Sequence, residues 1–184
     1  GETSSEVALR WGDRPILVYV CDEASGCEGF DKLEEVVLKD EKVALAMKAF
    51  RTVKMHPDHA ADEPVTRGEG KDVPRMLLVD PATLKVTVLE KGKLKARTLY
   101  KAMRKTAAKV YVEKLDKVVK THLKLLTEQD KLANAEKGLA EKLARLKGEE
   151  GKGAARELAE VEEEVAEVKT ELKAVQDKQR EIWK

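Results

Sequence analysis

The fold is decided by one stretch near the start of the chain, RPILVYVCDEASGC, which runs from Arg14 to Cys27. Its apolar part, ILVYV (16–20), is rich in β-branched residues, which is typical of a strand buried on both faces. The following CDEASGC holds both cysteines of the chain. Whether they form a redox pair, a metal site or a structural clip determines the class of function.

The residues after this stretch predict an α/β domain. Apolar residues at helical spacing, with Asp40 as an N-cap, indicate a helix broken near Lys39 and Asp40. A short strand is expected at 52–55, a second buried strand at 76–79, and an alternating edge strand at 84–88. The polar segment 56–72, HPDHAADEPVTRGEGKD, is expected to be a loop outside the core. The resulting order is strand, helix, strand, strand, strand, helix.

The second half of the chain has a helical period. From Arg97 to Leu146 the sequence has no proline and one glycine, which predicts sustained helix, and GEEGKG (148–153) predicts a turn. Heptads then resume, so the two helices should fold back as an antiparallel coiled-coil hairpin with Ile182 beside His122. The expected a and d positions are Leu115, Val118, His122, Leu125, Gln129, Leu132, Glu136, Leu139, Leu143 and Leu146, then Leu158, Val161, Val165, Val168, Leu172, Val175, Gln179 and Ile182.

The first long helix has an additional apolar row at e, formed by Val119, Leu126, Ala133 and Ala140. A stripe this wide is more than a two-helix seam needs, so it predicts either self-association or a protein partner. The alternative is that these small and branched residues only thicken the rim of the hairpin. The expected interaction residues of the seam are Leu125, Leu132, Leu139, Val165 and Leu172.

The sequence from Arg14 to Lys109 resembles the thioredoxin-like family. Three features carry the resemblance: RPILVYV as the central strand, a cysteine motif opening the next helix, and VPRMLLVDP as a Val-Pro step into a following strand. The resemblance implies a central sheet flanked by helices, a cis Val73–Pro74 bond, and a binding surface around Ala24, Ser25, Val73 and Pro74. The domains expected are a lead at 1–11, a thioredoxin-like domain at 12–110 and the hairpin at 111–184.

The cysteine motif departs from the family pattern. Thioredoxins carry Cys-x-x-Cys, with the first thiol activated at a helix N-terminus. Aligned from the strand, this chain has ASGC there, with Ala24 at the nucleophile's position and Cys27 matching the second cysteine. Glu23 replaces the usual tryptophan, and Ser25 is a cap residue rather than a substitute for a thiolate. The resemblance therefore implies a domain that lacks the attacking group.

Several roles remain open for the two cysteines. Cys27 and Cys21 could be catalytic, as a redox pair in a displaced register. Alternatively they could form a static disulfide, or remain two reduced thiols, one of them a small core residue. A copper or zinc site would add His56, with His59 and Met55 as further candidates. Such irregular ligand spacing favours no metal, and no other cofactor motif is present.

Composition excludes some classes of function. Basic and acidic residues number 36 and 35, which argues against nucleic acid as a partner. No apolar run is long enough to predict a membrane span. The compartment stays open, and because the chain begins with Gly1 an exported protein that has lost its signal is slightly favoured over a cytoplasmic one. The sequence thus predicts an interaction or oligomerisation module, with a thiol-disulfide oxidoreductase as the first alternative and a metal-binding protein as the second.

Overall fold

The first half of the chain is organised around one central strand. In the computed structural model, which describes residues 13–22, 33–148 and 152–183, strand β1 (Ile16–Val20) pairs in parallel with β2 (Arg51–Met55). On its other side β1 pairs antiparallel with β3 (Arg75–Val79), which pairs antiparallel with β4 (Val86–Leu89). The mixed sheet has the order β2-β1-β3-β4, and the expected α/β class is confirmed.

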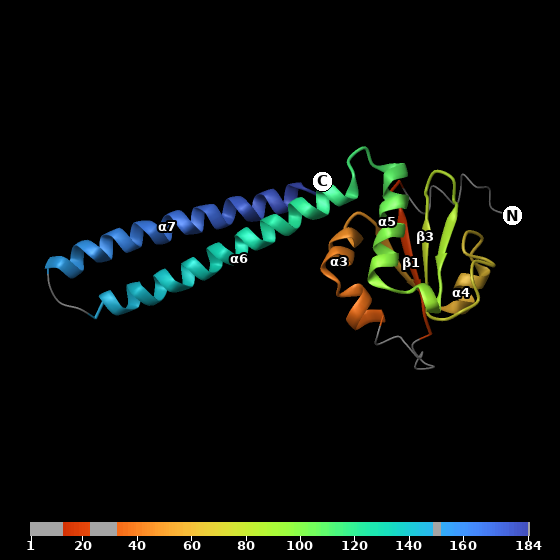
Figure 1. The fold of residues 1–184 in the computed structure, drawn as a ribbon, viewed down its shortest axis with the longest axis horizontal. Coiled ribbons are helices and arrows are strands. Elements are labelled where there is room, and N and C mark those ends of the chain that lie inside the picture. The colour runs from red at the N-terminus through yellow and green to blue at the C-terminus, as the bar shows by residue number, and fades with distance from the viewer. Residues whose placement is uncertain (1–12, 23–32, 149–151, 184) are drawn as a thin grey trace. The chain divides into compact units, whose positions relative to one another are not determined.

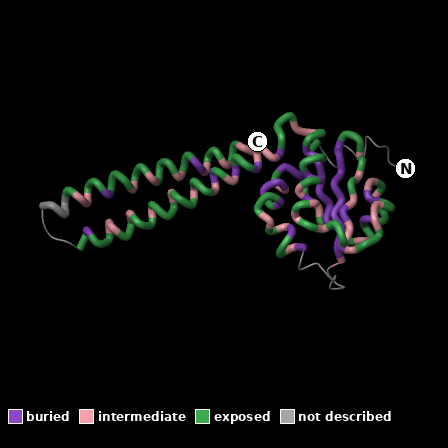
Figure 2. The backbone as a smooth tube through the Cα atoms, viewed as in Figure 1, coloured by how far each residue is buried: buried purple, intermediate pink, exposed green. Residues whose placement is uncertain are grey.

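Helices cover both faces of this sheet (Figure 1). One face carries the π-helical turn η1 (Leu33–Leu38), α3 (Glu41–Met47) and α5 (Ala96–Val110), and the other carries α4 (Pro57–Asp62). A short 3-10 turn, η2 (Lys91–Lys93), leads from β4 toward α5. Figure 2 shows that the buried residues gather on the two central strands, β1 and β3, where every residue is buried. Burial on both faces explains the continuous apolar runs in these strands.

The helix after β1 breaks where the sequence predicted. Lys39 and Asp40 separate η1 from α3, and the Asp40 carboxylate accepts hydrogen bonds at 3.1 Å from the backbone N–H groups of Lys42 and Val43. This is the predicted N-cap, and it satisfies donors that the first helical turn leaves unpaired. Leu33 and Val37 of η1 are buried, whereas Val36 is 60% exposed.

The expectation that the whole polar segment 56–72 is a loop outside the core was wrong at residues 57–62, which are helical, and at Ala60 and Thr66, which are buried. Pro57–Asp62 forms α4, with Pro57 in the first turn and His56 at the N-cap. Ala60 is fully buried in the apolar cluster of its sheet face, and the Thr66 hydroxyl donates to the Ala60 carbonyl at 2.8 Å. Helix α4 is attached to the sheet by one small apolar residue, Ala60, and by the hydrogen bond of the Thr66 hydroxyl. The hydropathy of the segment is therefore low, which explains why the sequence pattern did not predict the helix.

The helix expected to run unbroken from Arg97 to Leu146 is interrupted at residues 111–114. Tyr111 leaves the helical conformation after α5, and its hydroxyl donates to the Ala49 carbonyl at 2.6 Å. Helix α6 (Leu115–Leu146) then begins, and Asp116 in its first turn accepts from the Tyr100 hydroxyl at 2.8 Å. Arg104 also pairs with Asp116, at 2.5 Å. These polar contacts tie the interruption and the first turn of α6 to the globular unit.

The chain divides into two compact units at Val119 and Lys120. In the second unit α6 and α7 (Lys152–Glu181) run antiparallel, side by side (Figure 1). Every a and d position that the heptads predicted is buried or half-buried, whereas Ala133 and Ala140 of the predicted e row are exposed. The helical hairpin therefore closes along the predicted seam and leaves part of the e row uncovered.

Polar contacts inside the seam fix how the two helices slide against each other. The Gln179 side-chain amide donates to the Gln129 side-chain oxygen at 2.9 Å. The Trp183 indole N–H donates to Nδ1 of His122 at 3.0 Å, and His122 is only 3% exposed. Trp183, which contacts His122, directly follows the Ile182 that the register places beside His122. His122 is buried and the other three residues are half-buried, so slippage would leave polar groups that are partly shielded from water without these partners.

Gly138 lies within α6 without interrupting it, and a Cβ at this position would meet nothing within 4 Å. We expect Gly138→Ala to stabilise the second unit by about 1 kcal/mol, because alanine loses less backbone entropy than glycine in a helix. Denaturant unfolding followed by circular dichroism at 222 nm measures this gain. Unchanged or lower stability would contradict an unbroken α6.

Candidate functional site

The predicted site residues that the structure describes meet where β1 and β2 end. Because these strands are parallel, their carboxyl ends lie at the same edge of the sheet. The Cys21 backbone N–H donates to the Met55 carbonyl at 3.1 Å, which extends the strand pairing by one step. Val20 is paired with Arg75, so the same register brings Pro74 opposite Cys21. We call Cys21, Asp22, Met55, His56 and Pro74 the strand-end cluster.

The cluster brings together only part of the predicted site. Cys21 is 3% exposed, Pro74 is buried, and Val73 is half-buried. The Val73–Pro74 bond is cis, as the resemblance implied. Ala24, Ser25 and Cys27 lie outside the described residues. Attacking thiols in redox enzymes are partly exposed, so the burial of Cys21 suits a core residue or the second thiol of a pair.

His56 is engaged by neighbouring groups at both ring nitrogens. Its Nδ1 accepts from the Asp58 backbone N–H at 3.3 Å as the cap of α4, and its Nε2 lies 3.7 Å from a carboxylate oxygen of Asp22. The His59 ring lies nearby, with its centroid 6.2 Å from that of His56. A metal at His56 would have to displace the cap or the Asp22 contact.

The second alternative from the sequence is a metal site, and the described residues do not supply a set of ligands for one. Among residues 13–22, 33–148 and 152–183, no three His, Cys, Asp or Glu side chains are grouped so that they could hold a metal ion. Cys21, His56 and His59 share one edge of the sheet, but in this part of the chain they do not form such a group.

A buried charged group beside the Val-Pro step was missed by the sequence analysis. Arg75 follows Pro74 directly and is 6% exposed, and its Nη1 donates to the Asp72 carbonyl at 3.1 Å. Its Nε is buried with no hydrogen-bond partner among the described residues. Burial lowers the pKa of the Arg75 guanidinium, and the charges of Glu90 and Asp72 oppose that shift. The sequence did carry a signal for this buried charge, because Arg75 is a charged residue at the start of an otherwise apolar strand.

Glu90 fixes the loop that leads into Val73–Pro74. Its carboxylate accepts from the backbone N–H of Lys71 at 2.8 Å. Gly70 has a φ of +78°, and a Cβ there would lie 2.6 Å from the same carboxylate oxygen. Glycine is needed for both the backbone conformation and the close approach of Glu90. The position of the Val-Pro step thus depends on a contact between residues far apart in sequence.

Searches of the chain against family models, curated proteins and solved structures found no match. No helix in the described part of the chain combines the length and apolar character needed to cross a membrane. The function is therefore inferred from the geometry of the strand-end cluster and of the hairpin.

Substitution of two glycines in the same loop distinguishes the cost of backbone strain from the cost of a steric clash. Gly68 and Gly70 both have positive φ, but a Cβ at Gly68 would meet nothing within 4 Å. We expect Gly68→Ala to cost about 1 kcal/mol of unfolding free energy through its backbone alone. Gly70→Ala should cost at least about 2 kcal/mol, because the methyl group also displaces Glu90 and Val88.

Denaturant unfolding of the two variants, followed by near-ultraviolet circular dichroism of the globular unit, measures this difference. Equal losses in the two variants would show that the Glu90 contact does not hold the loop.

Proposed function

We propose that this protein is an atypical thioredoxin-like module that acts without catalysis, with its helical hairpin as the element that engages a protein partner. The observation that carries the proposal is the hairpin itself. Two helices of 32 and 30 residues close along a complete heptad seam, yet exposed small residues remain on α6. A coiled coil of this kind presents a long, regular surface suited to another helix.

The sheet supports the thioredoxin-like part of the proposal. A helical crossover joins the parallel strands β1 and β2, and two antiparallel strands and a closing helix follow. The order β2-β1-β3-β4 places the cysteine-bearing end of β1 beside the Val73–Pro74 step, as the resemblance requires. In this interpretation the strand-end cluster is a binding surface inherited from a redox fold.

The cysteine motif supports the non-catalytic part. The position that would carry the nucleophile is Ala24, and Cys21 is buried at the end of β1. Methyl groups form no covalent intermediate, and a buried thiol reaches a substrate disulfide only after local opening. The rival function is a thiol-disulfide oxidoreductase in which Cys27 attacks and Cys21 resolves.

Seam variants test the interaction function. We expect Leu132→Asp or Leu172→Asp to abolish partner capture, because each places a carboxylate in an apolar seam. Cys27→Ser should leave capture intact. A photo-crosslinking amino acid at Ala140, which is exposed on α6, with mass spectrometry of its products, identifies what is captured, including a second copy of the chain.

The matched control is Asn134→Asp, which adds the same charge on an exposed face of α6 two residues from Leu132. A second crosslinker at Val36, on the globular unit, reports capture that does not involve the hairpin. Products that arise only from Val36 and disappear in Cys27→Ser would contradict the proposed function and favour the oxidoreductase.

A redox titration tests the rival directly. We expect no reversible Cys21–Cys27 disulfide with a midpoint above about −300 mV, where many oxidoreductases lie. The measurement is intact-protein mass after thiol trapping, across a series of glutathione potentials, with Cys27→Ser as the blank. A reversible bond in that range would make the oxidoreductase the better description.

A further inference from the structure

The outer side of α6 carries a row of residues with a regular large-to-small pattern. We call the b and e positions between Leu123 and Ala144 the α6 row. At one end Leu123 and Leu126 are half-buried, and at the other Ala140 and Ala144 are exposed. The row spans about 30 Å at the rise of an α-helix, which is long enough for a stable contact between helices.

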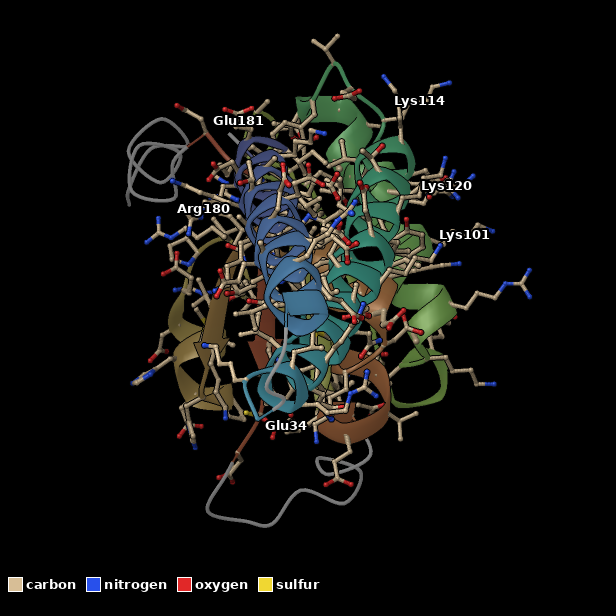
Figure 3. All side chains as sticks on the ribbon, turned by 90° about the vertical axis from the view of Figure 1, so that its left-hand side faces the viewer. Glu34, Lys101, Lys114, Lys120, Arg180 and Glu181 are labelled. Atoms are coloured by element: carbon tan, nitrogen blue, oxygen red, sulfur yellow. The ribbon has the colours of Figure 1, made fainter. Side chains whose placement is uncertain are left out.

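The row lies apart from contacts that the hairpin already makes. Helix α7 covers the a and d positions, and Lys142 at g pairs with Glu157 of α7 at 3.1 Å. Figure 3 shows the charged side chains of Lys120, Arg180 and Glu181 extending outward from their helices, and all three are exposed. Those charged side chains are solvated, whereas the α6 row is mainly aliphatic.

The row is complementary to itself when reversed. If a second α6 runs antiparallel with its centre at Ala133, Leu126 lies opposite Ala140, and Leu123 lies opposite Ala144 to within about 1.5 Å, the rise of one residue. A large residue then meets a small one at both ends of the contact, and the two copies of Ala133 meet at its centre. Such pairs let two helix axes approach closely without leaving voids.

The same register pairs opposite charges. Asp130 comes to lie opposite Lys137, again to within the rise of one residue, and the two-fold axis generates this pair twice. Both side chains are exposed, and neither makes an ion pair with another residue in the described part of the chain. A parallel alignment would instead set Asp130 against Asp130 and Lys137 against Lys137. The charges thus favour one orientation.

We propose that the occupant of the α6 row is a second copy of this chain, packed antiparallel about a two-fold axis at Ala133. The proposal rests on the proposed function, since it names the partner of the same hairpin. A two-fold interface requires that residue i meets j wherever j meets i. The row satisfies this for size and for charge, and an unrelated partner would have no need of that symmetry.

A charge exchange tests the pairing in the full chain. We expect sedimentation equilibrium to give a dimer that Asp130→Lys weakens by at least about tenfold, because the introduced ammonium group would meet Lys137 in both halves. Lys137→Asp should weaken it similarly, and the double exchange should restore it. The matched control is Glu163→Lys, the same charge reversal at an exposed f position of α7, which should leave association unchanged.

Disulfide trapping tests the axis. Ala133→Cys should form an intermolecular disulfide on mild oxidation, because the two copies of this position meet at the axis. Asn134→Cys, the next residue on the same helix, should not, since it points about 100° away. Circular dichroism verifies that each variant keeps its helices. Monomers at high concentration, or a dimer indifferent to Asp130→Lys and trapped equally at Asn134→Cys, would overturn the proposal.

The outcomes also separate this inference from the function on which it rests. If Ala140 crosslinks to a different protein and the chain itself is monomeric, the proposal that a second copy occupies the α6 row is refuted, whereas the interaction function is retained. A dimer that survives both Leu132→Asp and Asp130→Lys would refute the hairpin as its interface, and both conclusions would then fail.

Discussion

The pairing of β1 with two neighbours of opposite direction is the constraint on which the globular unit depends. A parallel neighbour requires a crossover, which η1 and α3 supply, and an antiparallel neighbour brings the start of β3 to the end of β1. The ends of β1 and β2 and the Val73–Pro74 step therefore share one edge. The strand-end cluster is a result of topology, and its chemistry depends on which side chains occupy that edge.

The described side chains at that edge are engaged in packing and in contacts with the backbone. Cys21 is buried, and His56 serves as a helix cap that also faces Asp22. Arg75 is held under the loop that Glu90 anchors. His56 holds the start of α4 in place, and Glu90 holds the loop before Val73–Pro74. The hairpin, by contrast, offers exposed side chains in a regular order.

Local signals made much of this structure predictable. The two buried strands, the Asp40 cap and the heptad seam follow from apolar period and capping, which need only neighbours along the chain. Helix α4 was missed because a single alanine seats it, and the interruption at 111–114 was missed because its cause is the hydroxyl of Tyr111 reaching Ala49. Glu90 and Asp22 act on groups distant in sequence, and no local pattern marks such contacts.

The polar residues in the hairpin seam set the register of the two helices, and the register determines which residues of α6 are exposed. Apolar heptads alone allow two long helices to shift by a turn, and each shift would present a different strip of α6 to solvent. The Gln129–Gln179 and His122–Trp183 hydrogen bonds disfavour those alternatives, since each shift would leave half-buried donors without these partners. A fixed register in turn fixes which b and e residues stay uncovered. The size and charge pattern of the α6 row, which we propose to be a recognition surface, is therefore set by the alignment of the seam beneath it.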